Sequence, residues 1–114
     1  MMIEQERAVE ETPIACNLTG EERAERGDTV HRLFQEVEQV RELEDGYAFR
    51  FAGGDAMASR LLQFTLEERR CCPFFTFELA FEPNEGSIWV RLRGSDTIKE
   101  FVASAWGEII AAHA

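Results

Sequence analysis

The fold is decided by residues 75–93, which read FTFELAFEPNEGSIWVRLR. Apolar side chains alternate with polar or small ones from Phe75 to Phe81. From Ile88 to Arg93, aliphatic side chains alternate with Trp89, Arg91 and Arg93. This alternation is typical of strands that bury one face. The intervening Pro83-Asn84-Glu85-Gly86 segment has the composition of a turn. The stretch therefore predicts an antiparallel hairpin on which the rest of the chain packs.

The segments before and after this hairpin predict three helices and one more long strand. Asp45-Gly46 is a turn signal, and residues 47–51 alternate as a strand with one buried face. Helical spacing of apolar residues predicts helices that begin near Thr19, Asp55 and Asp96, the second ending near Cys71 before Pro73. The expected core positions are Val30, Leu33, Phe34 and Val37 in the first helix, Met57, Leu61, Leu62, Phe64 and Thr65 in the second, and Ile98, Phe101, Val102, Ala105, Trp106, Ile109 and Ile110 in the third.

These elements predict an α+β fold in the order short β-α-β-α-β-β-α, where residues 13–18 form the short first strand. We expect a two-layer sandwich with three helices on one face of a small, largely antiparallel sheet. Residues 13–114 form a single domain, and residues 1–12 are interpreted as an acidic, mobile tail. The other face of the sheet would carry Phe74, Trp89, Arg91 and Arg93. An exposed Trp89 there would suit a homodimer interface, or it would be one large residue on a mixed face.

The composition excludes several classes of partner. The 114 residues carry a formal net charge of -10, which disfavours nucleic acids and anionic membranes. No apolar run has the length of a membrane span, and the N-terminus lacks the pattern of a secretion signal. Three cysteines are an odd number, which argues against a disulfide framework. We therefore expect a cytoplasmic protein with reduced thiols.

The most chemical feature of the chain is the adjacent pair Cys71-Cys72, followed by Pro73. Thiolates are ligands for soft ions, so the pair predicts a metal or metalloid site, with Cys16 as a third ligand if it lies near them in space. Three sulfurs suit zinc with a further ligand, or arsenite, whereas two suit mercuric ion. His31 flanks the first apolar stripe and His113 is penultimate, so neither is favoured as a fourth ligand.

Two other interpretations of the cysteines stay open. A redox thiol normally has a lowered pKa, and Arg69 and Arg70 would favour this, whereas the end of a helix opposes it. Buried cysteines also act as small hydrophobic residues in a structural or interaction module. The Glu67-Glu68-Arg69-Arg70 run is interpreted as a solvated helix face. The chain contains no phosphate loop or Ser-His-Asp set, so we expect a non-catalytic protein.

The chain resembles a group of small, uncharacterised bacterial proteins that carry a Cys-Cys-Pro-Phe motif and an upstream cysteine. The resemblance rests on residues 14–18, 45–51, 67–74 and 99–101 and covers most of the chain beyond the acidic tail. It implies a loose association with heavy-metal resistance and no established activity. The resemblance implies that the cysteines of this group correspond to Cys16, Cys71 and Cys72.

Overall fold

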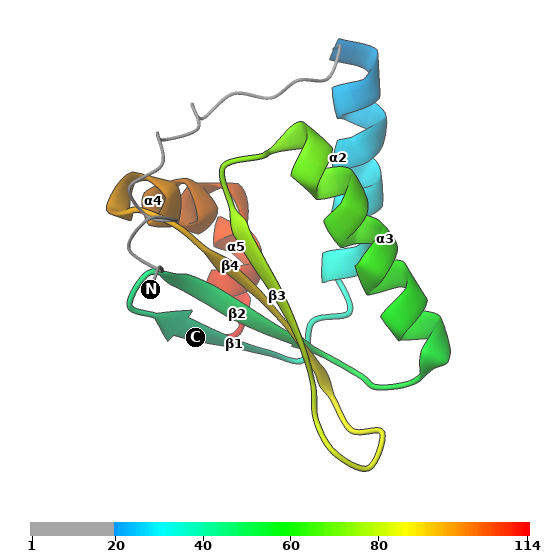
Figure 1. Cartoon of the computed structure of the whole chain (residues 1–114). Coiled ribbons are helices and arrows are strands. Elements are labelled where there is room, and N and C mark those ends of the chain that lie inside the picture. Colours follow the sequence, from blue (N-terminus) through cyan, green and yellow to red (C-terminus); the bar gives the residue numbers. More distant parts are fainter. Residues whose placement is uncertain (1–19) are drawn as a thin grey trace, which may run out of the picture.

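The computed structural model describes residues 20–114, and the predicted strand 13–18 and tail 1–12 lie outside this range. Within it the chain forms four helices and one four-stranded sheet, so the predicted α+β class is confirmed (Figure 1). The elements, in chain order, are α2 (Gly20–Phe34), β1 (Gln39–Leu43), β2 (Gly46–Phe51), α3 (Asp55–Cys71), β3 (Thr76–Phe81), β4 (Ile88–Arg93), α4 (Asp96–Ala105) and α5 (Gly107–Ala112).

The sheet is antiparallel throughout, with the strand order β1-β2-β4-β3. The predicted hairpin is present, with Phe77 opposite Leu92 and Leu79 opposite Val90. In the centre, Phe49 pairs with Val90, and both side chains are fully buried. Gly46 begins β2 where the backbone of β4 lies so close that a Cβ atom would be 1.9 Å from the Leu92 carbonyl oxygen. Only glycine fits this position without a shift of the backbone.

All four described helices contribute to a single core on one face of the sheet. Phe34 of α2 contacts the rings of Phe49, Phe51, Phe64 and Trp106, which come from β2, α3 and the junction between α4 and α5. These edge-on and tilted contacts are the favourable geometries for aromatic pairs. Figure 1 shows α2 beside α3 on the right, and α4 with α5 to the left of them. This arrangement confirms the prediction that the helices cover one sheet face.

The structure differs from the sequence prediction in its element count. Strand β1 was not predicted, because Gln39, Arg41 and Glu42 are polar and the strand lies at an edge of the sheet. The last predicted helix is two helices, α4 and α5, that meet at Trp106. Leu62 was placed in the core but is 51% exposed, because the buried face of α3 runs through Leu61, Phe64 and Glu68.

The outer face of the sheet differs from its prediction at two aromatic residues. Trp89 lies on this face, alternating with the core residues of β4, but it is only 5% exposed, and the guanidinium of Arg41 lies 4.7 Å from its ring centroid. Phe74 is on the core side, where it packs edge-on against Phe101 at 5.3 Å. The expected exposed tryptophan is therefore absent from the outer face.

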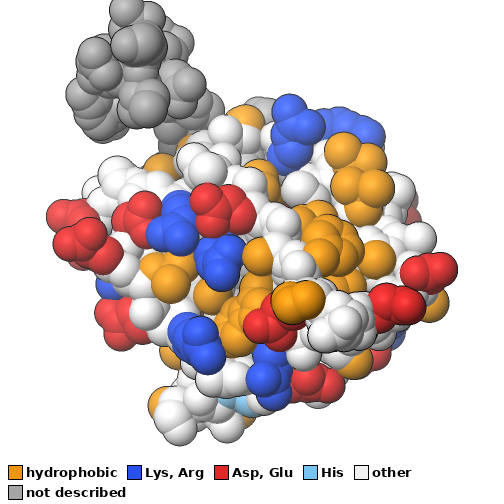
Figure 2. All heavy atoms as spheres, turned by 60° about the horizontal axis from the view of Figure 1, so that its bottom comes forward, with side chains coloured by type: hydrophobic (Ala, Val, Ile, Leu, Met, Phe, Trp, Pro, Cys, Tyr) orange, Lys and Arg blue, Asp and Glu red, His pale blue; other side chains and the backbone are white. Residues whose placement is uncertain are grey.

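The surface carries charges of both signs side by side. Figure 2 shows acidic and basic side chains interleaved around hydrophobic ones on the face it displays. On the outer sheet face, Arg93 lies 2.6 Å from Asp45 and 3.1 Å from Glu78. Across residues 20–114, no helix has both the length and the apolar character needed to cross a membrane.

Candidate functional site

The cysteine pair lies at the end of α3, where the helix turns into the loop before β3. Cys71 is the last residue of the helix, and the backbone N–H of Cys72 still donates to the Glu68 carbonyl at 2.6 Å. Cys72 itself has an extended φ of -128°, as expected for a residue before proline. The predicted end of this helix is therefore confirmed.

The two thiols are buried, reduced and close together. Cys71 is 6% exposed and Cys72 is 8% exposed. Their Sγ atoms lie 3.6 Å apart, and the Cys72 thiol donates to the Cys71 sulfur. Adjacent side chains do not point the same way in a regular helix or strand, so the change of backbone conformation at Cys72 is what brings the sulfurs together. The local fold thus presents two sulfur atoms as a pair.

A buried ion pair lies one helical turn before the cysteines. Glu68 is 5% exposed, and its Oε1 accepts a hydrogen bond of 3.0 Å from Arg26 Nη2 of α2. The same Nη2 donates to the Phe64 carbonyl, and Nη1 lies 3.2 Å from Glu67 Oε1. Arg26 therefore joins α2 to α3 beside the thiols, and its charge offsets that of the buried carboxylate.

Burial controls the protonation of this corner of the molecule. It raises the pKa of Glu68 above its ordinary value, although Arg26 and the hydrogen bond to Cys72 oppose that shift. Burial also raises the pKa of Cys72 far above its ordinary value, and the neighbouring Glu68 charge adds to the effect. Cys72 is therefore a protonated thiol at neutral pH. It lacks the lowered pKa of a reactive redox cysteine.

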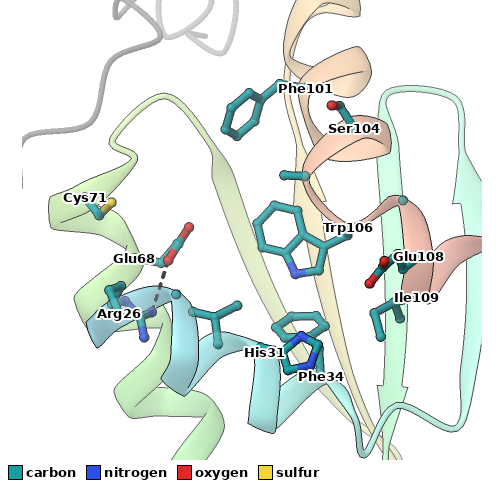
Figure 3. Close-up of a pocket in the computed structure, with 14 residues that line it drawn as sticks. Arg26, His31, Phe34, Glu68, Cys71, Phe101, Ser104, Trp106, Glu108 and Ile109 are labelled. Atoms are coloured by element: carbon teal, nitrogen blue, oxygen red, sulfur yellow. Dashed lines mark hydrogen bonds and ion pairs between the residues drawn. The ribbon is translucent and has the colours of Figure 1, made fainter. Parts of the chain in front are cut away.

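A cavity of about 530 Å³ opens beside the pair, between α2, α3 and the junction of α4 with α5. Figure 3 shows Cys71 and Glu68 on one side of it and Trp106 and Glu108 toward the other. Phe34, Phe101 and Trp106 give it aromatic walls. Trp106 is 7% exposed, and its indole Nε1 has no hydrogen-bond partner among the described residues.

The structure brings Cys71 and Cys72 together, whereas Cys16 lies outside the described residues. Among the side chains that the structure describes, there is no group of three His, Cys, Asp or Glu residues arranged to hold a metal ion. His31 is exposed at the cavity edge, where its Nε2 lies 3.2 Å from Gln35 Nε2. His113 pairs through Nδ1 with the Ile109 carbonyl at 2.9 Å. The described part of the site therefore offers two sulfurs.

The interpretation of Glu68 as part of a solvated face was wrong. A signal for its burial was present, because Leu61, Phe64, Glu68 and Cys71 follow one another at the helical spacing of one face. A glutamate in the line of such a stripe faces the core and needs a cation. Arg26 was not identified as that cation, because it lies 42 positions away in the sequence.

Comparisons with protein-family models, with curated proteins and with solved structures give no match. The assignment of a role therefore rests on the residues and geometry of the site itself.

Proposed function

We propose that the protein binds a soft metal or metalloid ion through the thiolates of Cys71 and Cys72, without catalysis. The observation that carries the proposal is the 3.6 Å separation of the two sulfur atoms. Sulfur is the ligand that soft ions prefer, and two adjacent sulfurs chelate one ion without a rearrangement of the backbone.

The separation also favours some coordination geometries over others. Two bonds of about 2.3 Å to one ion, the length of zinc–thiolate bonds, span about 3.8 Å at the tetrahedral angle and about 4.6 Å in a line. The observed 3.6 Å is close to the first value. It supports a pyramidal or tetrahedral ion, such as arsenite or zinc, over linear mercuric ion.

Cys16 remains our proposed third sulfur ligand. A third thiolate would complete a pyramidal site for arsenite, whereas zinc would require a fourth ligand as well. The proposal requires a reducing compartment such as the cytoplasm, because chelation needs free thiols. Each thiol must release its proton when the ion binds.

The two alternative functions have less support. A thiol redox role needs a stabilised thiolate, and burial beside Glu68 has the opposite effect on Cys72. A homodimeric interaction module was based on an exposed Trp89, but that ring lies beneath Arg41. The ion-binding role remains the one that uses the paired sulfurs.

Native mass spectrometry of the reduced full chain tests the proposal, with Zn²⁺, Hg²⁺ and arsenite added separately without oxygen. We expect one retained ion in the wild type, and its loss in Cys71→Ser and in Cys72→Ser. Cys16→Ser tests the third ligand. Met57→Leu is the matched control, because it removes another buried sulfur from α3 at a cost below about 1.5 kcal/mol. Retention of the ion by the Cys71→Ser/Cys72→Ser double variant, or no ion in the wild type, would contradict the proposal.

A further inference from the structure

We propose that the ligand is an organic compound of trivalent arsenic, in which arsenic is bonded to Cys71 and Cys72 and its carbon substituent occupies the 530 Å³ cavity. This inference deepens the proposed function and rests on it. It names a substrate class, an aryl or alkyl arsenical, in place of a bare ion.

The separation of the paired sulfurs fits such a compound. Trivalent arsenic makes three bonds, and the described residues supply two sulfurs 3.6 Å apart. With bonds of about 2.3 Å, this separation corresponds to an angle of about 100° at the central atom, which is pyramidal. A carbon substituent fills the third position, which in an arsenite complex would be taken by the sulfur of Cys16.

The position of the cavity supplies a place for that carbon substituent. Cys71 is itself part of the cavity wall, so an atom bonded to its sulfur lies at the cavity boundary (Figure 3). An apolar cavity of roughly 150 Å³ accommodates benzene, so the volume here is sufficient for a phenyl group, and Arg26, Glu68 and Glu108 make the remaining part of the lining polar. Phe34, Phe101 and Trp106 line it with aromatic surface, which favours a phenyl group over a hydrated ion.

The charges of the site agree with a neutral adduct. Glu68 and Arg26 already form a compensated pair, 3.0 Å apart, on the cavity wall. An arsenic dithiolate with one carbon substituent is uncharged, so it leaves that balance intact. The unpartnered Trp106 N–H is a buried donor in the same cavity, and an acceptor atom on the organic group would satisfy it.

The binding step is an exchange of ligands without oxidation or reduction. Phenylarsine oxide reacts with the two thiols, two arsenic–sulfur bonds form, and the arsenic–oxygen double bond breaks. The oxygen leaves as one water molecule with both thiol protons. Arsenic stays trivalent, so no co-reactant is needed.

Binding of phenylarsine oxide and arsenite to variants that narrow the cavity tests the inference. Gly27 and Gly107 lie on the cavity wall, and a Cβ atom at either meets nothing within 4 Å. We expect Gly27→Leu and Gly107→Leu to weaken phenylarsine oxide binding at least tenfold and to change arsenite binding less than twofold. The matched control is Ala56→Leu, at an exposed position of α3 outside the cavity.

The outcomes separate this inference from the proposed function. Equal affinity for phenylarsine oxide in wild type and both glycine variants would overturn the inference and leave ion binding intact. Failure of the wild type to bind phenylarsine oxide while it retains arsenite, Zn²⁺ or Hg²⁺ would overturn the inference alone. Failure to retain any of these compounds or ions would overturn both.

A fluorescence measurement keeps the inference testable if the glycine variants do not fold. Trp89→Phe leaves Trp106 as the single tryptophan. We expect phenylarsine oxide to change its emission far more than arsenite does. Equal changes with both compounds would place the phenyl group outside the cavity and overturn the inference.

Discussion

Both faces of the sheet carry an ion pair between arginine and glutamate, but the pair is buried on the helix side and exposed on the outer side. On the helix side, Arg26 and Glu68 form a pair whose side chains are 11% and 6% exposed. On the outer side, Arg93 pairs with Glu78 and Asp45, but these side chains are 29%, 43% and 47% exposed. Water screens the charges of the exposed pair, whereas the buried charges of Arg26 and Glu68 are stabilised mainly by each other.

This difference in burial supports the proposed position of the binding site. Exposed pairs contribute little to stability. A buried pair has a high desolvation cost, so its presence beside two thiols and a cavity calls for an explanation beyond packing. Arg26 and Glu68 form a polar part of the cavity wall, beside the proposed binding site.

The largest expected effect on the free energy of unfolding comes from a substitution in the aromatic core on the helix side of the sheet. Phe34→Ala should lower the free energy of unfolding by about 3–5 kcal/mol, because Phe34 packs against four aromatic rings. Phe81, at the edge of the sheet, is 61% exposed, so Phe81→Ala should change it by about 0.5 kcal/mol or less. Urea titration of both variants measures the difference. Equal losses would show that the core is not centred on Phe34.

The stability costs of replacing Arg26 and Arg93 should differ almost as strongly. Arg26→Ala leaves a buried carboxylate without its cation, which should cost about 3 kcal/mol. Arg93→Ala removes an exposed cation, which should cost about 1 kcal/mol or less. Denaturant unfolding at neutral pH compares them. A cost for Arg93→Ala equal to that of Arg26→Ala would break the distinction between the two sides.

The pH dependence of stability should report the burial of Glu68. Its pKa is raised from 4.5 in the folded protein, so the folded state holds this proton more tightly than the unfolded state. Stability from this group is therefore greatest below pH 4.5 and falls as pH rises toward the folded pKa. Glu68→Gln cannot titrate, so it should gain stability relative to the wild type across this window.

Unfolding of the ion-free wild type and Glu68→Gln at a series of pH values measures that relative gain. Glu78→Gln is the control, because it makes the same substitution at an exposed glutamate on the outer face of the sheet. A constant difference between Glu68→Gln and wild type at all pH values would mean that Glu68 titrates normally.

The smallest effect on stability should come from removing Arg41, whose guanidinium lies over the Trp89 ring on the outer face. Arg41→Ala removes the cation above the indole ring and should cost about 0.5–1 kcal/mol. It should also make Trp89 more accessible to acrylamide quenching in a Trp106→Phe background. Arg32→Ala, another exposed arginine, is the control. Unchanged quenching in Arg41→Ala would mean that Arg41 does not shield the ring.

The sequence predicted the elements whose side chains follow a clear period. The hairpin of β3 and β4 and the end of α3 at Cys71 were read from alternation and from Pro73. Strand β1 was missed because a polar edge strand has no such period. The break between α4 and α5 was missed for a similar reason. The helical spacing of apolar residues continues from α4 into α5, although the helix is interrupted at Trp106.

The candidate site was only half predictable. The cysteine pair was evident from its adjacency, but the 3.6 Å separation depends on the backbone at Cys72. The cavity forms between α2, α3 and the junction of α4 with α5, so no local pattern reveals it. The pairing of Arg26 with Glu68 depends on how two helices pack, which is a property of the fold as a whole.

X-ray absorption at the arsenic edge, on reduced protein loaded with one equivalent of phenylarsine oxide, tests the central claim most directly. We predict two sulfur neighbours at about 2.3 Å and one carbon neighbour, with no oxygen in the first shell. Cys71→Ser should hold no arsenic that is bonded to two sulfurs. An oxygen-only first shell in the wild type, or two sulfurs retained in Cys71→Ser, would contradict chelation by Cys71 and Cys72.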